Sequence, residues 1–302
     1  MTLPLSQGEL TIDRMCRLAG VSRAGYYRHW AASAPRAEET EVRDAIQRLA
    51  LAHRHYGYRR ISAQLRREGL AVNRKRVLRL MQQDNLLCLR QKPFVPITTN
   101  SRHNWHVVPN LARGMVPNGL DQLWVADITY VRLEEEFVYL AVVIDAFSRR
   151  VVGWALETHI EASLAIAALT MAIEARRPMP SSLIHHSDRG TQYACHDYTE
   201  LLQQHDIIAS MSRVGNPYDN AKAESFMKTL KKEEVNGRTY RDEQHARNAI
   251  GSFIEEVYNR QRLHSALAYR PPAEFEETLQ LCGAAAQQPR KAAPIAQPVQ
   301  PL

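Results

Sequence analysis

The sequence has few cysteines and no long apolar run. Cys16, Cys88, Cys195 and Cys282 are far apart in 302 residues, which excludes a Cys-x-x-Cys metal or redox pair. Scattered thiols are typical of a reducing compartment. No window reaches the roughly 18 apolar residues of a membrane-spanning helix, and no apolar run follows a basic start as in a signal peptide. We therefore expect a cytoplasmic protein with no membrane segment.

The composition does supply what a folded core requires. Hydrophobic residues make up 45% of the chain and charged residues 24%, enough for one large or two modest domains. The formal net charge is +7. A surplus of positive charge favours a polyanionic partner.

The positive charge is concentrated between residues 53 and 92, where eleven lysines and arginines face two acidic residues. Apolar spacing predicts a helix over 61–68, a break at Gly69 and a second helix capped by Asn73. Helix-turn-helix units place their second helix in the DNA major groove, so we predict DNA binding; a solvated basic face is the alternative. The candidate DNA-binding residues are Arg59, Arg60, Arg74, Lys75, Arg76 and Arg79.

Composition and periodicity divide the chain into five segments. Residues 1–36 form a small helical segment, either a helix-turn-helix corner or a packing hairpin. Residues 38–92 form the helix-turn-helix domain, and 93–118 are a Pro- and Asn-containing linker. Residues 119–280 form a second domain, and 281–302, rich in Ala, Gln and Pro, form a disordered tail.

The second domain begins with strand patterns. We predict strands at 122–132, 137–144, 151–156, 183–186 and 207–211, and helices at 161–176, 195–205, 219–233 and 242–258. Short connections pair the first three strands antiparallel, and helices separate the later ones. The expected fold class is therefore α/β, a mixed five-stranded sheet with flanking helices, preceded by an all-α region.

Three carboxylates in this domain are candidate metal ligands. Asp127 lies on an otherwise apolar strand, where a carboxylate is costly unless it is paired or metal-bound. Asp188 directly follows the strand at 183–186, and Glu224 lies near the start of a helix. Carboxylate oxygens are ligands that Mg²⁺ prefers. By contrast, Asp145 ends its strand before a polar turn, and we expect it to cap that turn; a role in the site is the alternative.

Further side chains near these carboxylates allow two interpretations each. Lys228 and Lys231 share the helix face of Glu224 and could hold a phosphate backbone, or Glu224 and Lys228 could form an ordinary solvated pair. His186 could assist Asp188, although a packed hydrogen-bonding role is simpler. We expect Trp124 in the core.

Two segments near the end of the domain are equally open. Residues 216–220 most simply build the turn and cap before the Glu224 helix, with contact to a DNA end as the alternative. Arg260, Arg262 and His264 either follow phosphates or solvate a loop.

The spacing of the carboxylates resembles that of a known family. Asp188 and Glu224 are separated by 35 residues, with Lys231 seven residues further on. With Asp127, this pattern resembles the DDE site of retroviral integrases and their bacterial relatives. Over about residues 40–276, the motifs resemble the second-reading-frame transposase (OrfB) of the IS-three family of insertion sequences. These motifs are Tyr56-Gly57-Tyr58-Arg59-Arg60, Asp127-Ile128-Thr129-Tyr130, His186-Ser187-Asp188-Arg189-Gly190, Asn216-Pro217-Tyr218-Asp219-Asn220-Ala221, Ala223-Glu224-Ser225-Phe226, and Tyr258-Asn259 with Arg262 and His264-Ser265-Ala266-Leu267.

The resemblance implies a ribonuclease-H-like integrase catalytic core with Asp127, Asp188 and Glu224 as catalytic residues and metal ligands. It implies two Mg²⁺ ions, which Mn²⁺ can replace, and DNA strand cleavage followed by 3′-OH strand transfer. The implied partners are double-stranded DNA (terminal inverted repeats and target), further copies of the chain on paired ends, and an upstream-frame protein (OrfA), separate or fused. The expected location is the cytoplasm, at the nucleoid.

Two other functions stay open at this point. The chain could be a catalytically silent DNA-binding regulator derived from a transposase, or a plain ribonuclease-H-type nuclease. The complete set of three carboxylates, together with Lys231, favours the transposase.

Overall fold

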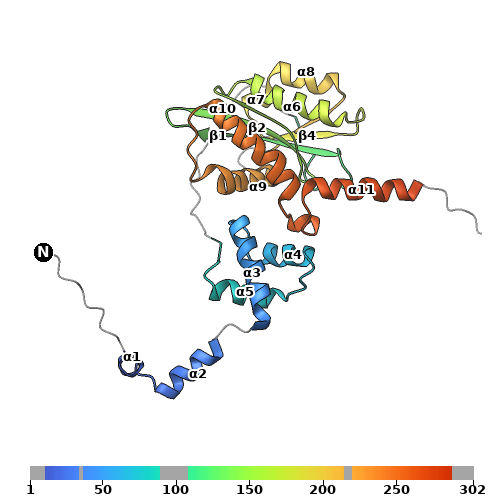
Figure 1. Cartoon of the computed structure of the whole chain (residues 1–302). Helices are drawn as coiled ribbons and strands as arrows, with labels where there is room; N and C mark the ends of the chain where they lie inside the picture. The colour runs from blue at the N-terminus through green and yellow to red at the C-terminus, as the bar shows by residue number, and fades with distance from the viewer. Residues whose placement is uncertain (1–10, 34–36, 89–107, 214–219, 288–302) are drawn as a thin grey trace, which may run out of the picture. The chain divides into compact units, whose positions relative to one another are not determined.

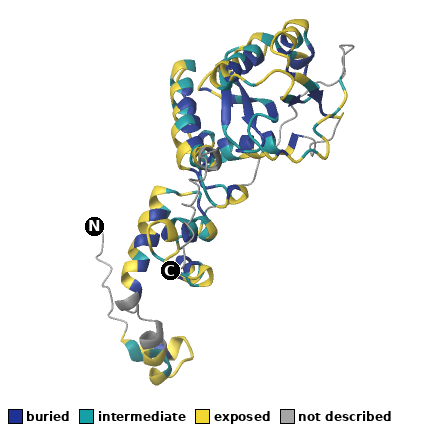
Figure 2. Cartoon of the chain, turned by 90° about the vertical axis from the view of Figure 1, so that its right-hand side faces the viewer, coloured by how far each residue is buried: buried dark blue, intermediate teal, exposed yellow. Residues whose placement is uncertain are grey.

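The computed structural model describes residues 11–33, 37–88, 108–213 and 220–287. The chain divides into two compact units, Met1–Arg90 and Gln91–Leu302, here called the N-terminal and C-terminal units. Each has its own buried residues, which gather in the helices of the first and the sheet of the second (Figure 2). No helix in the described ranges combines the length and the apolar character that crossing a membrane requires.

The N-terminal unit is helical. Its helices are α1 (Ile12–Leu18), α2 (Arg23–Ser33), α3 (Ala37–Ala52), α4 (Tyr58–Arg67) and α5 (Arg74–Gln83). The predicted cap is confirmed, because the Asn73 side chain accepts a hydrogen bond of 2.8 Å from the Lys75 amide. Ile46, Ile61, Leu65, Val77 and Leu80 are fully buried. Packing of this apolar face, rather than helix propensity, stabilises helices as short as α4 and α5.

The C-terminal unit contains the predicted mixed sheet of five strands. Its strands are β1 (Leu123–Arg132), β2 (Phe137–Asp145), β3 (Val151–Glu157), β4 (Ile184–Ser187) and β5 (Ile208–Met211). The order is β3-β2-β1-β4-β5; β1 to β3 are antiparallel, and β4 pairs parallel with both β1 and β5. The first three strands are joined by short turns, and helices return the chain to β4 and β5.

Helices cover both faces of the sheet (Figure 1). One face packs against α6 (Ala162–Arg176), α7 (Thr191–Ala194) and α8 (His196–Gln204). The other packs against α9 (Ala221–Leu230), α10 (Glu243–Ser252) and the π-helix η3 (Phe253–Gln261). Gly153 lets α6 approach β3 closely, since a Cβ there would lie 2.2 Å from the Ala168 carbonyl oxygen.

Two predicted segments differ from the structure. The helix predicted at 219–233 is α-helical only to Leu230 and continues as the π-helix η2 (Lys231–Val235). The segment 281–302, predicted as a disordered tail, begins inside α11 (Pro272–Gln287), which follows the 3-10 turn η4 (Ser265–Leu267). Pro272 is the first residue of α11, a position where a proline loses no helical hydrogen bond.

Candidate active site

The parallel pairing of β1 and β4 brings Asp127 and Asp188 to the same level. Val125 pairs with His186, and each aspartate lies two residues further along its strand direction. Two residues along a strand restore the same face, so Asp127 lies on the Val125 face, which α9 covers. Asp127 Oδ1 accepts a hydrogen bond of 2.9 Å from the Ile128 amide, and Asp188 Oδ1 one of 2.9 Å from the Gly190 amide.

Helix α9 carries Glu224 to these aspartates. Asn220, immediately before α9, donates from Nδ2 to the Ala126 carbonyl at 2.8 Å and so ties the helix to β1 next to Asp127. This corrects the prediction that Asn220 caps α9, because its side chain makes no capping hydrogen bond. The rest of that predicted turn, 216–219, lies outside the described residues.

The electrostatics of Asp127 indicate that the three carboxylates lie close together. Burial, together with the charges of Asp188 and Glu224, raises the pKa of Asp127 to about 7, although the Ile128 amide and the Lys231 ammonium act to lower it. Close carboxylates disfavour one another's ionised forms. Near neutral pH the Asp127 carboxyl is therefore close to half protonated and can exchange a proton for a cation.

The donor set suits a hard cation. It consists of carboxylate oxygens at one end of the sheet, in a partly buried place where a positive charge would offset their repulsion. As the side chains stand, the described residues contain no group of three or more His, Cys, Asp or Glu arranged to hold a metal ion. Asp127 and Asp188 accept hydrogen bonds from nearby backbone amides, and Glu224 Oε2 lies 3.5 Å from Lys228 Nζ. Joint coordination therefore requires these side chains to rotate.

The two lysines next to Glu224 have different environments. Lys228 is 79% exposed and pairs with Glu224 one helical turn away. Lys231 is the first residue of η2, where its Nζ lies 4.8 Å from the centre of the Tyr130 ring. Burial lowers the pKa of Lys231, and the charge of Asp127 opposes that shift. Of the two lysines, Lys231 is therefore the one whose charge interacts with that of Asp127.

The predicted DNA-binding arginines also separate into groups. Arg79 and Arg76 lie 2.6 and 3.5 Å from the buried carboxylate of Glu39 on α3. Arg59 and Arg60 lie against the rings of Tyr58 and Tyr56. The exposed candidates at the start of α5 are Arg74 and Lys75.

Other candidates have structural partners. Asp145 is buried and accepts hydrogen bonds from the amides of Asp121, Phe147 and Ser148, as expected of a turn cap. His186 is bonded through both ring nitrogens to Ser210 and Ser212, each at 2.9 Å. Trp124 is fully buried.

Tyr193 is a candidate that the sequence did not indicate. It is buried on α7, and among the described residues its Oη has no hydrogen-bond partner. Burial, Tyr198 and the carboxylates of Asp188 and Asp127 all raise its pKa, so the phenol stays protonated beside the aspartates. The sequence shows that Tyr193 is five residues after Asp188, but this spacing does not show where the Tyr193 ring lies.

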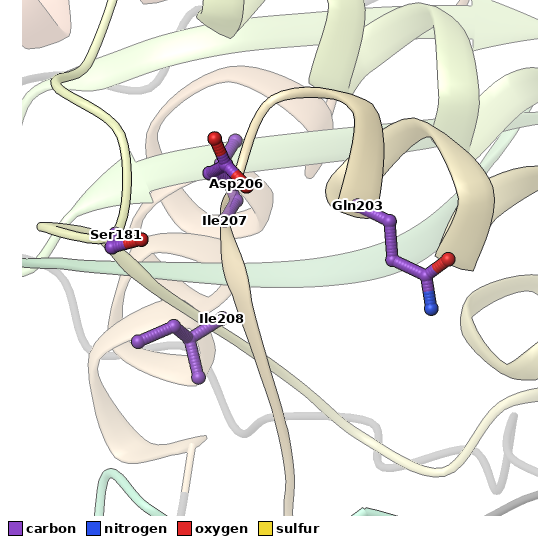
Figure 3. Close-up of a pocket in the computed structure, with 5 residues that line it drawn as sticks. All are labelled: Ser181, Gln203, Asp206, Ile207 and Ile208. Atoms are coloured by element: carbon purple, nitrogen blue, oxygen red, sulfur yellow. The ribbon is translucent and has the colours of Figure 1, made fainter.

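One pocket lies away from this site. It is lined by Ser181, Gln203, Asp206, Ile207 and Ile208 (Figure 3). These residues lie around the beginnings of β4 and β5, whereas Asp188 follows the end of β4. The pocket is therefore at the opposite end of β4 from Asp188.

Solved structures of integrases show weak similarity to the chain. A chain of the simian T-cell lymphotropic virus intasome is 16% identical, with a TM-score of 0.42 over 85% of this chain and 80% of that one. The HTLV-2 integrase catalytic core domain in complex with magnesium is 16% identical, with a TM-score of 0.40 over 51% of this chain and 95% of that one.

The sequence comparisons are much stronger. The integrase core domain matches residues 117–217 and again 205–272, and an HTH-like domain matches 36–94. The insertion element IS600 31 kDa protein of Shigella sonnei is 40% identical over 87% of this chain and 97% of that protein. The transposase InsF of insertion sequence IS3A from Escherichia coli is 36% identical over 89% of this chain and 95% of that protein. The chain therefore belongs to the IS3 family of insertion-sequence transposases, which are DDE-type polynucleotidyl transferases.

Proposed function

We propose that Asp127, Asp188 and Glu224 are the catalytic carboxylates of this transposase and bind two Mg²⁺ ions, which Mn²⁺ can replace. Ions held by these carboxylates would activate the attacking oxygen and stabilise the leaving oxygen of a phosphodiester. The observations that support the site are the parallel pairing of β1 with β4, which brings Asp127 and Asp188 to the same level, and the charges of Asp188 and Glu224, which raise the pKa of Asp127.

The proposed reaction has two displacements at phosphorus. Water attacks the phosphodiester at the end of the element, and a 3′-OH leaves. That 3′-OH then attacks a phosphodiester of the target DNA, whose own 3′-oxygen leaves. The carboxylates carry no covalent intermediate; they orient the attacking and leaving groups, while Lys231 and the exposed Lys228 contact the DNA backbone.

The N-terminal unit is proposed to bind the terminal inverted repeats as double-stranded DNA. Arg74 and Lys75 are its main phosphate contacts because they are exposed at the start of the second helix of the pair. Arg59, Arg60, Arg76 and Arg79 are further proposed contacts; Arg59 and Arg60 lie against tyrosine rings, and Arg76 and Arg79 lie beside Glu39. The same proposal includes the domain boundaries 38–92, 93–118 and 119–280. It also includes assembly of several copies on paired ends, an OrfA partner and a cytoplasmic, nucleoid-associated location.

Asp188→Asn tests the site. With Mg²⁺ or Mn²⁺ and DNA carrying an element end, we expect cleavage and joining to disappear, because the amide cannot replace a carboxylate ligand. The Kd for end DNA should stay within about twofold, since phosphate contacts elsewhere set it. The measurements are gel assays of both steps and fluorescence anisotropy, with Asp197→Asn, whose side chain is 79% exposed, as the matched control.

Two outcomes would contradict the proposal. Equal loss of binding and joining in Asp188→Asn would mean that binding and catalysis are not separate. A wild-type chain that binds ends but never cuts them with either ion, even with its upstream-frame partner, would instead be the silent regulator.

A further inference from the structure

The side chains of Tyr258, Asn259 and Arg262 point into the protein. All three residues are buried, although the sequence allowed Arg262 to follow phosphates or solvate a loop. A residue that contacts a DNA backbone must present its charge at the surface. We therefore look at the protein groups that these three side chains contact.

Asn259 attaches η3 to the sheet. Its Oδ1 accepts a hydrogen bond from the Val151 amide and its Nδ2 donates to the Val151 carbonyl, both at 3.0 Å. Val151 is the first residue of β3, at the edge of the sheet. Both backbone groups of one residue are thus satisfied by one amide, which fixes the place of η3 along β3.

Arg262 extends this attachment to η2. Its Nε and Nη2 donate to Glu233 Oε2 and Oε1 at 2.9 and 2.8 Å, and the two side chains are only 8% and 9% exposed. A two-pronged arginine–carboxylate pair restricts orientation as well as distance. Glu233 lies in η2, two residues after Lys231.

The same guanidinium reaches α9 through aromatic rings. It lies 5.9 Å from the centre of the Tyr258 ring, and that ring contacts Phe226 edge to face at 4.7 Å. Phe226 is two residues after Glu224. Contacts from Arg262 therefore reach the chain inside the segment that joins Glu224 to Lys231, through Tyr258 to Phe226, and just after it, at Glu233.

The helix that carries Glu224 and Lys231 is not regular along its length. The chain changes from α-helical to π-helical hydrogen bonding at Lys231, and such turns occur often at functional sites. A buried ion pair is weak evidence for stability, because an apolar pair of similar volume often stabilises as much. Its distinctive contribution here is the orientation of η2 relative to η3.

We propose that Asn259 and Arg262 are positioning residues that connect β3 to α9 and η2 and so hold Glu224 and Lys231 toward Asp127. We call Asn259, Arg262, Glu233 and Tyr258 the brace. This inference rests on the proposed function of the three carboxylates.

The double substitution Glu233→Met/Arg262→Met tests the brace in the full-length chain. The control is His196→Met/Glu200→Met, which removes a solvent-exposed pair, 82% and 52% exposed, from α8. We expect the brace variant to fold but to join DNA at least about tenfold more slowly, because small misplacements of reacting groups cost large factors in rate. Its Kd for end DNA and its salt dependence should match the control. Mn²⁺ binding to the DNA-free chain, titrated by electron paramagnetic resonance, should weaken.

Hydrogen exchange supplies a readout independent of activity. Amides of residues 221–235 should exchange faster in the brace variant than in the control. Arg262→Lys, which keeps the charge but not the two-pronged geometry, should show the same changes to a smaller degree. If the double variant does not fold, Arg262→Lys is the variant that tests the brace.

Unchanged exchange and joining in the folded brace variant would overturn the inference. A lower salt slope with weaker DNA binding would overturn it as well, because Arg262 would then contact a phosphate. If the wild-type chain itself neither binds Mn²⁺ nor cleaves DNA, the proposed function is wrong. The hydrogen-exchange comparison then still tests whether the brace holds residues 221–235 in place.

Discussion

At the scale of single residues, Asp127 is the carboxylate whose surroundings matter most. It is held on a buried strand beside two other carboxylates, and its pKa is raised to about 7 from an ordinary value of 3.8. The folded protein therefore binds this proton more tightly than the unfolded chain. The stability associated with the protonated carboxyl is complete below about pH 4 and is lost as the pH rises through 7.

Asp127→Asn should consequently stabilise the metal-free protein at high pH. We expect its Tm to exceed that of wild type by several degrees at about pH 8, because each kcal/mol shifts Tm by about 2–4 °C in a domain of this size. At about pH 4 the difference should shrink, since the wild-type carboxyl is then protonated. Thermal melts in EDTA at both pH values measure this, with the exposed Asp197→Asn as control. A difference that is the same at both pH values would show that charge is not its cause.

At the scale of elements, the helix pair α4–α5 combines a packed apolar face with a charged one. The sequence predicted both helices and the Asn73 cap because capping and apolar spacing are local properties. It could not show that Arg76 and Arg79 lie beside Glu39, because that carboxylate is on α3, far away in the chain. The charges of Arg76 and Arg79 are therefore partly compensated by Glu39, and Arg74 and Lys75 lie exposed at the start of α5.

Arg74→Gln/Lys75→Gln should weaken binding to all DNA sequences alike. Each lost phosphate contact lowers the slope of log K against log salt by about 1. Anisotropy titrations at several salt concentrations measure the slope. Arg48→Gln, which removes an exposed arginine from α3, is the matched control and should leave the slope unchanged. A loss confined to one DNA sequence would instead indicate base recognition by the pair.

At the scale of the whole molecule, the chain consists of two units with separate cores. The candidate metal ligands all lie in the C-terminal unit, and the helix pair of the N-terminal unit carries its own cap and apolar face. The two functions proposed for the chain therefore depend on different packed cores.

Calorimetry should separate these cores. We expect two transitions, with Mn²⁺ raising only that of the C-terminal unit, because a ligand stabilises the folded unit that binds it. Asn73→Ala should lower only the other transition, by the equivalent of about 1 kcal/mol for a lost helix cap. A single transition that responds to both changes would show that the units unfold as one.

The sequence by itself determined the five strands, most of the helices, the family and the three candidate carboxylates, but not the π-helical turns or α11. Strand alternation, helix spacing and caps depend on neighbours within a few residues, and motif spacing is written directly in the chain. The tertiary structure alone decided that Asn220 binds the Ala126 carbonyl and that Arg262 pairs with Glu233. Each of these contacts joins residues brought together by sheet order and helix packing. Local sequence patterns do not encode such partners, because the partner of a buried polar group is chosen by which distant element covers it.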